Sequence, residues 1–252
     1  MANNQRYFIE LAYDGTNYHG WQIQQNAVSV QELLNKALST LLRHPIETIG
    51  CGRTDTGVHA KEYFAHFDGP KSEIENSKFE IGINALLPHD IAVKRIIPVN
   101  ADAHARFDAT LRSYEYHIHF EKNPFLNGYS WLLRDKPDME LMNQAAAIIM
   151  EYIDFSCFSK SNTQVKTNNC KIAKAIWEQT DNGIIFKISA DRFLRNMVRA
   201  IVGTLLMVGK GEMLPEEIRT IIESKNRSKA GMSVPACGLY LTEIKYPYPP
   251  TP

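Results

Sequence analysis

The sequence predicts an α+β protein made of two related subdomains, each with a mainly antiparallel sheet flanked by helices. Three observations lead to this prediction. Strand-like runs alternate irregularly with amphipathic segments of helical period, and the same mixture occurs in both halves of the chain. Hydrophobic residues make up 44% of the 252 residues, enough to fill the core of one large domain or the cores of two ordinary ones. We expect subdomains at residues 1–104 and 105–252, with a cleft between them.

The first half reads as strand, helix, two strands, helix and strand. Residues 7–13 are strand-like, and Asp14 with Gly15 supplies the turn that ends the run. Ser29 and Glu32 form a capping box, so a helix should begin there and stop at His44-Pro45. The other elements expected in this half are strands at 46–52, 62–68 and 91–99 and a helix at 72–87.

The second half repeats the mixture of strands and helices. Asp181-Asn182-Gly183 favours positive φ angles, which predicts a hairpin turn within residues 172–190. Pro215 marks the start of a short helix. The remaining expectations are a strand at 114–119, helices at 138–152 and 192–208, and a closing strand at 239–246.

The charge balance is informative only when it is followed along the chain. The 28 basic and 28 acidic residues cancel, which alone argues weakly against a nucleic-acid partner. Between Cys157 and Lys210, however, the sequence has nine basic residues and only three acidic ones, and such a region can bind a polyanion.

Several classes of protein are disfavoured by composition. The four cysteines, Cys51, Cys157, Cys170 and Cys237, form no Cys-x-x-Cys pair, so we expect reduced thiols and neither a zinc nor a redox site. No run of about eighteen apolar residues occurs, and the first residues are polar. We therefore expect no membrane association and a cytoplasmic protein.

The segment Gly50 to Ala60 carries the clearest chemical pattern. Glycines bracket Arg53-Thr54-Asp55 at the end of a predicted strand, which places the carboxylate of Asp55 on a tight turn. A guanidinium two residues away favours the ionised carboxylate, which can act as nucleophile or base. An aspartate that caps a turn beside a structural ion pair would explain the same pattern.

Other candidate residues also allow more than one interpretation. Tyr114 and Tyr116 share one face of a predicted strand, as two core residues would. Arg192, Arg195 and Arg199 follow one face of the helix expected at 192–208, opposite an apolar stripe, as on any solvated surface. His117 and His119 share a strand face, but no third metal ligand is evident.

Five motifs, in order from residue 13 to residue 241, resemble those of the TruA family of tRNA pseudouridine synthases. The segment Gly52-Arg53-Thr54-Asp55-Thr56-Gly57-Val58-His59-Ala60 resembles the catalytic motif, with Thr56 where the family usually has alanine. No motif covers residues 159–169. The other four motifs are Tyr13-Asp14-Gly15-Thr16 with Gly20-Trp21-Gln22; Phe107-Asp108-Ala109 with Arg112 and Tyr114-Glu115-Tyr116; Phe193-Leu194, Met197-Val198-Arg199 and Ile201-Val202-Gly203; and Pro235-Ala236 with Gly238-Leu239-Tyr240-Leu241.

The resemblance implies a pseudouridine synthase fold and a cofactor-free isomerisation of uridine at positions 38 to 40 of the tRNA anticodon stem-loop. Asp55 would be the essential aspartate, which attacks the uridine or promotes cleavage of its glycosidic bond. Tyr114 would lie under the flipped uracil and could relay a proton, and Arg199 would pair with Asp55. A homodimer that grips one tRNA is also implied.

The resemblance also implies where the RNA binds. Arg53 has two possible tasks, to orient Asp55 or to hold a phosphate while the base is out of its stack, and we favour the second. Arg192 and Arg195 would face phosphates. Asp14, Trp21 and Gln22 would line the RNA path, although Trp21 would serve equally well as a core residue.

Two other functions fit parts of the sequence. A non-catalytic RNA-binding protein would use the aromatic and basic residues, but a carboxylate aimed at a polyanion would repel it. A hydrolase could combine Asp55 with the scattered histidines, with or without a metal ion, and metal analysis of the protein would test this.

Overall fold

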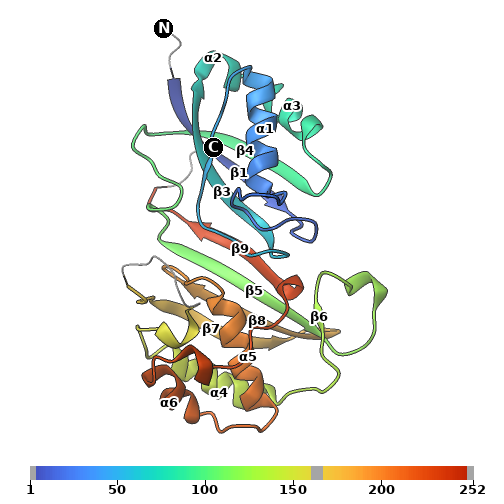
Figure 1. Ribbon diagram of the computed structural model, residues 1–252, viewed down its shortest axis with the longest axis vertical. Coiled ribbons are helices and arrows are strands. Elements are labelled where there is room, and N and C mark those ends of the chain that lie inside the picture. Colours follow the sequence, from blue (N-terminus) through green and yellow to red (C-terminus); the bar gives the residue numbers. More distant parts are fainter. Residues whose placement is uncertain (1–3, 160–166, 249–252) are drawn as a thin grey trace. The chain divides into compact units, whose positions relative to one another are not determined.

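A computed structural model of the chain describes residues 4–159 and 167–248. Contacts divide the chain into two compact units, Met1–Thr110 with Leu241–Pro252 as unit 1, and Leu111–Tyr240 as unit 2. Each unit combines strands and helices, so the α+β prediction is confirmed (Figure 1). The segment 159–169, for which we had no interpretation, lies largely outside the described residues.

The division differs from the expected one at residues 104 and 105. Residues 105–110 stay with unit 1, because the buried His66 accepts a hydrogen bond from the Ala105 N–H over 3.1 Å. Residues 241–245 of the last strand, β9 (Leu239–Lys245), return to the same unit. Its Lys245 carbonyl accepts from the Thr110 N–H over 2.8 Å, a pairing between distant residues that local sequence patterns do not reveal.

In unit 1, β4, β1 and β3 pair antiparallel in that order, the short β2 also pairs antiparallel with β3, and β9 follows β3 in the sheet. Its strands are β1 (Asn4–Tyr13), β2 (Ile49–Gly50), β3 (His59–Pro70) and β4 (Ile91–Val99). The strand expected at 46–52 is therefore mostly irregular. The side chain of Asn35 accepts from the Thr48 N–H over 3.0 Å, which occupies a donor that a longer strand would use.

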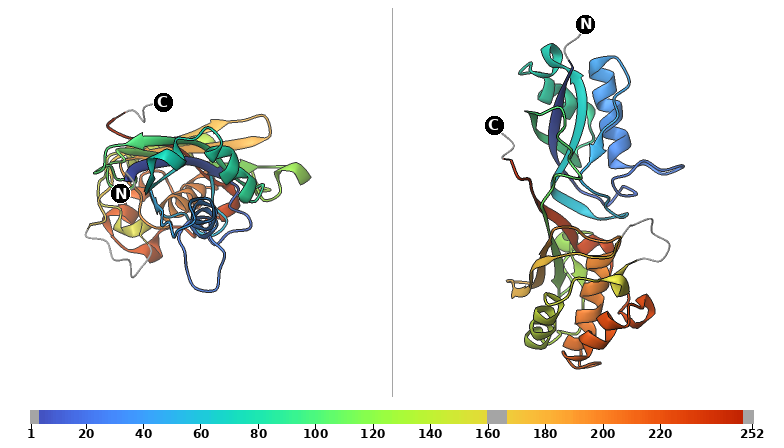
Figure 2. Two further views of the ribbon diagram at one scale, coloured as in Figure 1. Left: turned by 90° about the horizontal axis from the view of Figure 1, so that it is seen from above. Right: turned by 90° about the vertical axis from the view of Figure 1, so that its left-hand side faces the viewer.

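The helices of unit 1 follow the sequence signals only in part. Helix α1 (Val30–Leu42) begins as predicted, with the Ser29 hydroxyl accepting from the Glu32 N–H over 3.3 Å, and lies along one face of the sheet (Figure 2). The helix expected at 72–87 is instead two helices, α2 (Lys71–Ile74) and α3 (Phe79–Leu86). Asn76 breaks the helix, because its side chain accepts from the Lys78 N–H over 3.0 Å and closes a local turn.

Unit 2 has an antiparallel sheet in the order β5-β8-β7, with β6 paired parallel to β5. Its strands are β5 (Leu111–His119), β6 (Trp131–Leu132), β7 (Ile172–Gln179) and β8 (Gly183–Ala190). The hairpin turn between β7 and β8 lies where predicted, closed by the Thr180 N–H donating to the Gly183 carbonyl over 2.9 Å, but neither Asn182 nor Gly183 has the positive φ that the sequence led us to expect.

Helices α4 (Met139–Ile149), α5 (Met197–Gly209) and α6 (Glu217–Glu223) complete unit 2, and α4 contacts β7 and both other helices. The described residues of the unit also form four short 3-10 helices, η1 (Pro124–Leu126), η2 (Ser156–Phe158), η3 (Arg227–Lys229) and η4 (Ala236–Gly238). Across residues 4–159 and 167–248, no helix has both the length and the apolar character needed to cross a bilayer.

Helix α5 starts five residues later than expected, so Arg192 and Arg195 do not lie on it. Asn196 precedes the helix in a left-handed conformation, with φ of 65°. The Asp191 carboxylate accepts from the N–H groups of Lys171 and Arg192, both over 2.7 Å, and holds the preceding residues in a turn. The regular spacing of the arginines suggested a helix, but these local hydrogen bonds delay its start.

Candidate active site

Asp55 lies at the first position of a tight turn that leads into β3. The Val58 N–H donates to the Asp55 carbonyl over 3.2 Å, and Gly57 has a φ of +77°. This left-handed conformation at the third turn position favours glycine, because other residues have a Cβ that clashes there. Asp55 itself is half-buried. The motif glycine therefore shapes the backbone that carries the carboxylate.

Residues 13–20 hold this turn in place. The hydroxyls of Tyr13 and Thr54 are 2.9 Å apart in a buried hydrogen bond, and the Gly57 N–H donates to the Tyr18 carbonyl over 3.3 Å. Gly20, with φ of +82°, packs so closely that a Cβ there would lie 2.1 Å from the Thr54 carbonyl oxygen. The sequence analysis did not predict that Gly20 packs against Thr54. The only signal for this contact was the presence of glycines in both motifs.

Asp14 and Gly15 complete the support beside the turn. The Asp14 carboxylate accepts from the Thr16 N–H over 2.9 Å and from its hydroxyl over 2.6 Å, which closes a local turn. The Gly15 N–H donates to Nδ1 of the buried His59 over 3.1 Å. A Cβ on Gly15 would lie 2.0 Å from the Val58 carbonyl oxygen, so the two loops touch through their backbones.

Trp21 lies in the core, which corrects the expectation that it lines the RNA path. Its side chain is 1% exposed and stacks on Tyr63, with ring centroids 4.2 Å apart. The Tyr63 hydroxyl donates to the Gly52 carbonyl, so this aromatic pair supports the segment that leads to Asp55. Gln22 is exposed, and its amide donates to the Gln31 side chain over 2.9 Å.

Arg53 is exposed, and its guanidinium forms no hydrogen bond or ion pair with any residue in 4–159 or 167–248. It therefore does not pair with Asp55, two residues further along the chain. Of the two tasks considered for Arg53, orientation of Asp55 is therefore not supported by any contact between the two side chains. An exposed arginine without an acidic partner is available to an anion from solution.

In unit 2, Tyr114 and Tyr116 share a face of β5 but have different surroundings. Tyr116 is fully buried and donates to the Pro235 carbonyl over 2.8 Å, and burial raises its pKa. Tyr114 is half-buried, and its ring meets that of Phe193 edge to face at 5.1 Å. Tyr116 is thus a core residue, whereas part of the Tyr114 side chain is accessible.

Arg199 lies in the first turn of α5 and is held from one side by the loop before η4. Its Nε donates to the Val234 carbonyl over 2.7 Å, and the Val234 N–H donates back to the Arg199 carbonyl over 3.3 Å. Arg227 fixes that loop by donating to the Gly231 carbonyl and to the Ser233 hydroxyl, both over 3.0 Å. Sequence reasoning missed Arg227, which no motif includes.

The remaining candidate residues are two arginines before α5 and His117 on β5, and the two arginines differ in exposure. Arg195 is exposed and Arg192 is half-buried. Nε2 of His117 contacts the Glu115 carboxylate over 3.2 Å. No group of three or more His, Cys, Asp or Glu side chains suited to hold a metal ion occurs in the described ranges.

The four cysteines are free thiols, as predicted. Burial raises the pKa of the Cys157 and Cys170 thiols to about 12, so neither is a thiolate at neutral pH.

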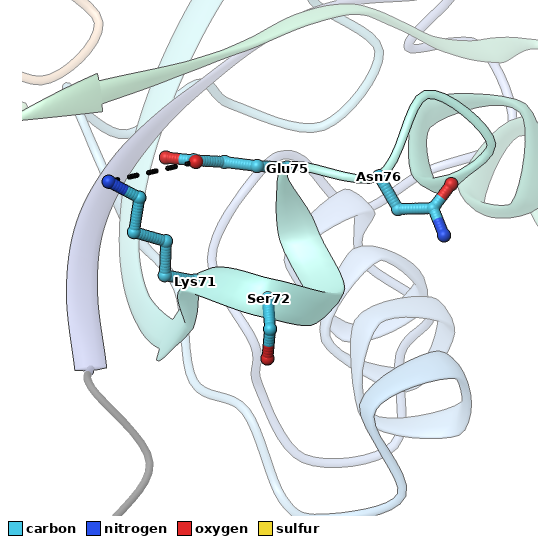
Figure 3. Close-up of a pocket in the computed structure, with 4 residues that line it drawn as sticks. All are labelled: Lys71, Ser72, Glu75 and Asn76. Carbon is cyan, nitrogen blue, oxygen red and sulfur yellow. Dashed lines mark ion pairs between the residues drawn. The ribbon is translucent and has the colours of Figure 1, made fainter.

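A surface hollow of about 530 Å³ lies at α2 and is lined by Lys71, Ser72, Glu75 and Asn76 (Figure 3). It follows the last residue of β3, whereas Asp55 precedes the first, and a strand of that length spans roughly 35 Å. Nζ of Lys71 and a carboxylate oxygen of Glu75 are 3.8 Å apart across it. The hollow is therefore separate from the Asp55 turn.

Comparison with known proteins agrees with the motifs. The sequence model of the family described as tRNA pseudouridine synthase matches residues 11–108 and 152–247. The chain is 53% identical to tRNA pseudouridine synthase A of Bacteroides fragilis, with 96% of this chain and 97% of that protein aligned. It is 54% identical to the protein of that name from Bacteroides thetaiotaomicron, over 96% and 91% of the two chains. The protein of that name from Clostridium acetobutylicum is 40% identical over 94% of this chain and 98% of its own. The chain belongs to the tRNA pseudouridine synthase family.

Proposed function

We propose that this protein isomerises uridine to pseudouridine at positions 38 to 40 in the anticodon stem-loop of tRNA, with Asp55 as its catalytic carboxylate. The observation that carries the proposal is the Asp55 turn, which Gly57 shapes and residues 13–20 support through buried and backbone contacts. Identities of 53% and 54% to relatives named tRNA pseudouridine synthase A support the substrate.

The reaction breaks the bond between N1 of uracil and C1′ of ribose and forms a bond from C5 to C1′. It is redox-neutral, so the protein has to supply only a carboxylate, a pocket for the base and proton transfer. Asp55 starts the reaction by attack on the nucleotide or by promoting cleavage of the glycosidic bond. The C5 proton is lost and N1 gains one.

A uridine within a stem-loop must leave its stack to reach Asp55, and an aromatic ring can replace the lost stacking. Tyr114 supplies that ring in our proposal, since it is partly accessible whereas Tyr116 is buried. In the same proposal, the hydroxyl of Tyr114 relays a proton. In this proposal Arg199, anchored through its Nε to Val234, acts on the same nucleotide.

The RNA backbone is bound by arginines in this proposal. Arg53 holds a phosphate near the flipped nucleotide, which is supported by its exposure and its lack of an acidic partner in the described part of the chain. Arg192 and Arg195 hold phosphates from the turn before α5. Gln22 and Asp14 lie beside the RNA path. We also propose that two copies of the chain act together on one tRNA, in the cytoplasm.

The direct test uses an unmodified tRNA transcript with uridine at positions 38 to 40, purified protein and a chelator. Pseudouridine is mapped by carbodiimide treatment and primer extension, and confirmed by mass spectrometry. We expect modification at one or more of the three positions, and none in a control transcript with cytidine there. Tight binding without modification would instead indicate a non-catalytic RNA-binding protein, and activity lost with the chelator would indicate a metal enzyme.

A further inference from the structure

The segment between β4 and β5 exposes a phenylalanine that has no role in the site described above. Phe107 belongs to the motif Phe107-Asp108-Ala109, and the residue is 74% exposed. It is adjacent to Arg106, whose guanidinium carbon lies 5.6 Å from the centre of the ring. The ring of His104 packs against it, with centroids 4.2 Å apart and planes inclined by 34°.

The backbone of this segment is fixed by elements on either side of it. Arg6 of β1 donates to the Ala103 carbonyl over 3.2 Å. His66 of β3 accepts from the Ala105 N–H, and the Tyr246 hydroxyl donates to the Ala105 carbonyl over 2.8 Å. Phe107 is therefore presented from a rigid segment.

Hydrogen bonds within the segment also fix His104, which packs against the Phe107 ring. Nδ1 of His104 accepts from the N–H groups of Arg106 and Phe107, over 3.1 and 3.3 Å. Asp108 accepts from the His104 N–H and from the Tyr248 hydroxyl, each over 2.7 Å. Because burial lowers the pKa of His104, its imidazole is neutral at neutral pH and keeps its role as acceptor.

We propose that Phe107, backed by His104 and flanked by Arg106, is a stacking site for an unpaired base of the RNA substrate. A planar apolar ring beside a guanidinium suits a nucleotide, because the ring stacks on the base and the guanidinium attracts the phosphate. Stacking tolerates any base, so the site contributes affinity and no sequence preference. The inference rests on the proposed function, since it requires an RNA substrate.

Binding of an unmodified tRNA transcript is measured for Phe107 variants, both in the parent protein and in protein that carries Asp55→Asn. The Asp55→Asn proteins separate affinity from turnover. Phe107→Ala should weaken binding roughly 5- to 150-fold, which is the range for loss of one stacked base. Phe107→Leu should weaken binding similarly, since it keeps apolar bulk but not the ring. Phe107→Trp should restore affinity, and its fluorescence should fall when RNA is added.

Phe125→Ala is the matched control. Phe125 is 87% exposed and has no ring or cation contact with the described residues, so this variant should bind tRNA as the parent does. Equal affinity of Phe107→Ala and the parent, or equal losses from both phenylalanines, would overturn the stacking site. A changed oligomeric state of Phe107→Ala without RNA would show that a second copy of the chain covers the ring, and would overturn it too. If the parent protein binds no tRNA, the proposed function fails rather than the placement of this site.

Discussion

Replacement of Gly20 by alanine should disrupt the turn that carries Asp55 without touching any charged group. The new Cβ would lie 2.1 Å from the Thr54 carbonyl oxygen, whereas real Cβ atoms essentially never approach within 3.0 Å, so the backbone must move by nearly 1 Å. Gly20 also has φ of +82°, which costs other residues roughly 1 to 2 kcal/mol. Overpacking adds roughly 1 to 3 kcal/mol, for a total of about 2 to 5 kcal/mol.

This loss should lower the thermal midpoint by roughly 10 °C in a chain of this size. In the protein that stays folded, displacement of Asp55 by about 1 Å should reduce turnover roughly 100-fold. Gly52→Ala is the control in the same segment, because a Cβ added there would have no atom within 4 Å and the φ of Gly52 is not positive. Differential scanning calorimetry and single-turnover isomerisation of a tRNA transcript measure both effects. A Gly20→Ala protein with the midpoint and rate of Gly52→Ala would refute the reasoning.

Three further predictions concern other residues. Tyr114→Ala should lose roughly 5- to 150-fold in turnover, because the base loses its stacking partner. Tyr114→Phe should keep tRNA affinity and so separates the role of the ring from that of the hydroxyl. Wild-type turnover by the alanine variant would argue against stacking. Arg192→Ala with Arg195→Ala should reduce the slope of log affinity against log salt by roughly 1.5, with the double lysine variant as control, and an unchanged slope would mean that neither contacts phosphate. Burial, aided by the neighbouring His104 and Arg6, lowers the pKa of His66 from 6.5 to about 4, so the unfolded state binds the proton more readily and stability should fall as pH drops from 6.5 towards 4. Between pH 7 and pH 5 this amounts to about 2 kcal/mol in urea unfolding, which His66→Gln should abolish; equal pH dependence in both proteins would contradict it.

The elements whose signals are local could be predicted closely. The capping residue Ser29 marks the start of α1, and Asp181-Asn182-Gly183 marks the turn between β7 and β8. The start of α5 was mispredicted, because Arg192 and Arg195 continue the spacing of the helix although Asn196 is left-handed. A periodic pattern does not report the hydrogen bonds that compete with a helix.

The candidate site was predictable in its chemistry but not in its support. The glycines around Asp55 indicate a tight turn, which the structure has. Gly20 and Tyr13 contact this turn only because of the fold, since both lie far from it in the sequence. Tyr13 and Thr54, for example, have a sequence separation of 41. Trp21 was placed on the RNA path because aromatic residues serve equally in cores and at interfaces, and only its burial distinguishes the two.

The most direct test of the account compares wild-type protein with Asp55→Asn, which keeps the size of the side chain and removes its charge. Pseudouridine in an unmodified tRNA transcript is counted by mass spectrometry, and tRNA affinity is measured on the same samples. We predict that Asp55→Asn forms no pseudouridine above the background without protein, while its affinity stays within a few fold of wild type. Turnover near the wild-type rate would contradict the central claim that this carboxylate carries out the isomerisation.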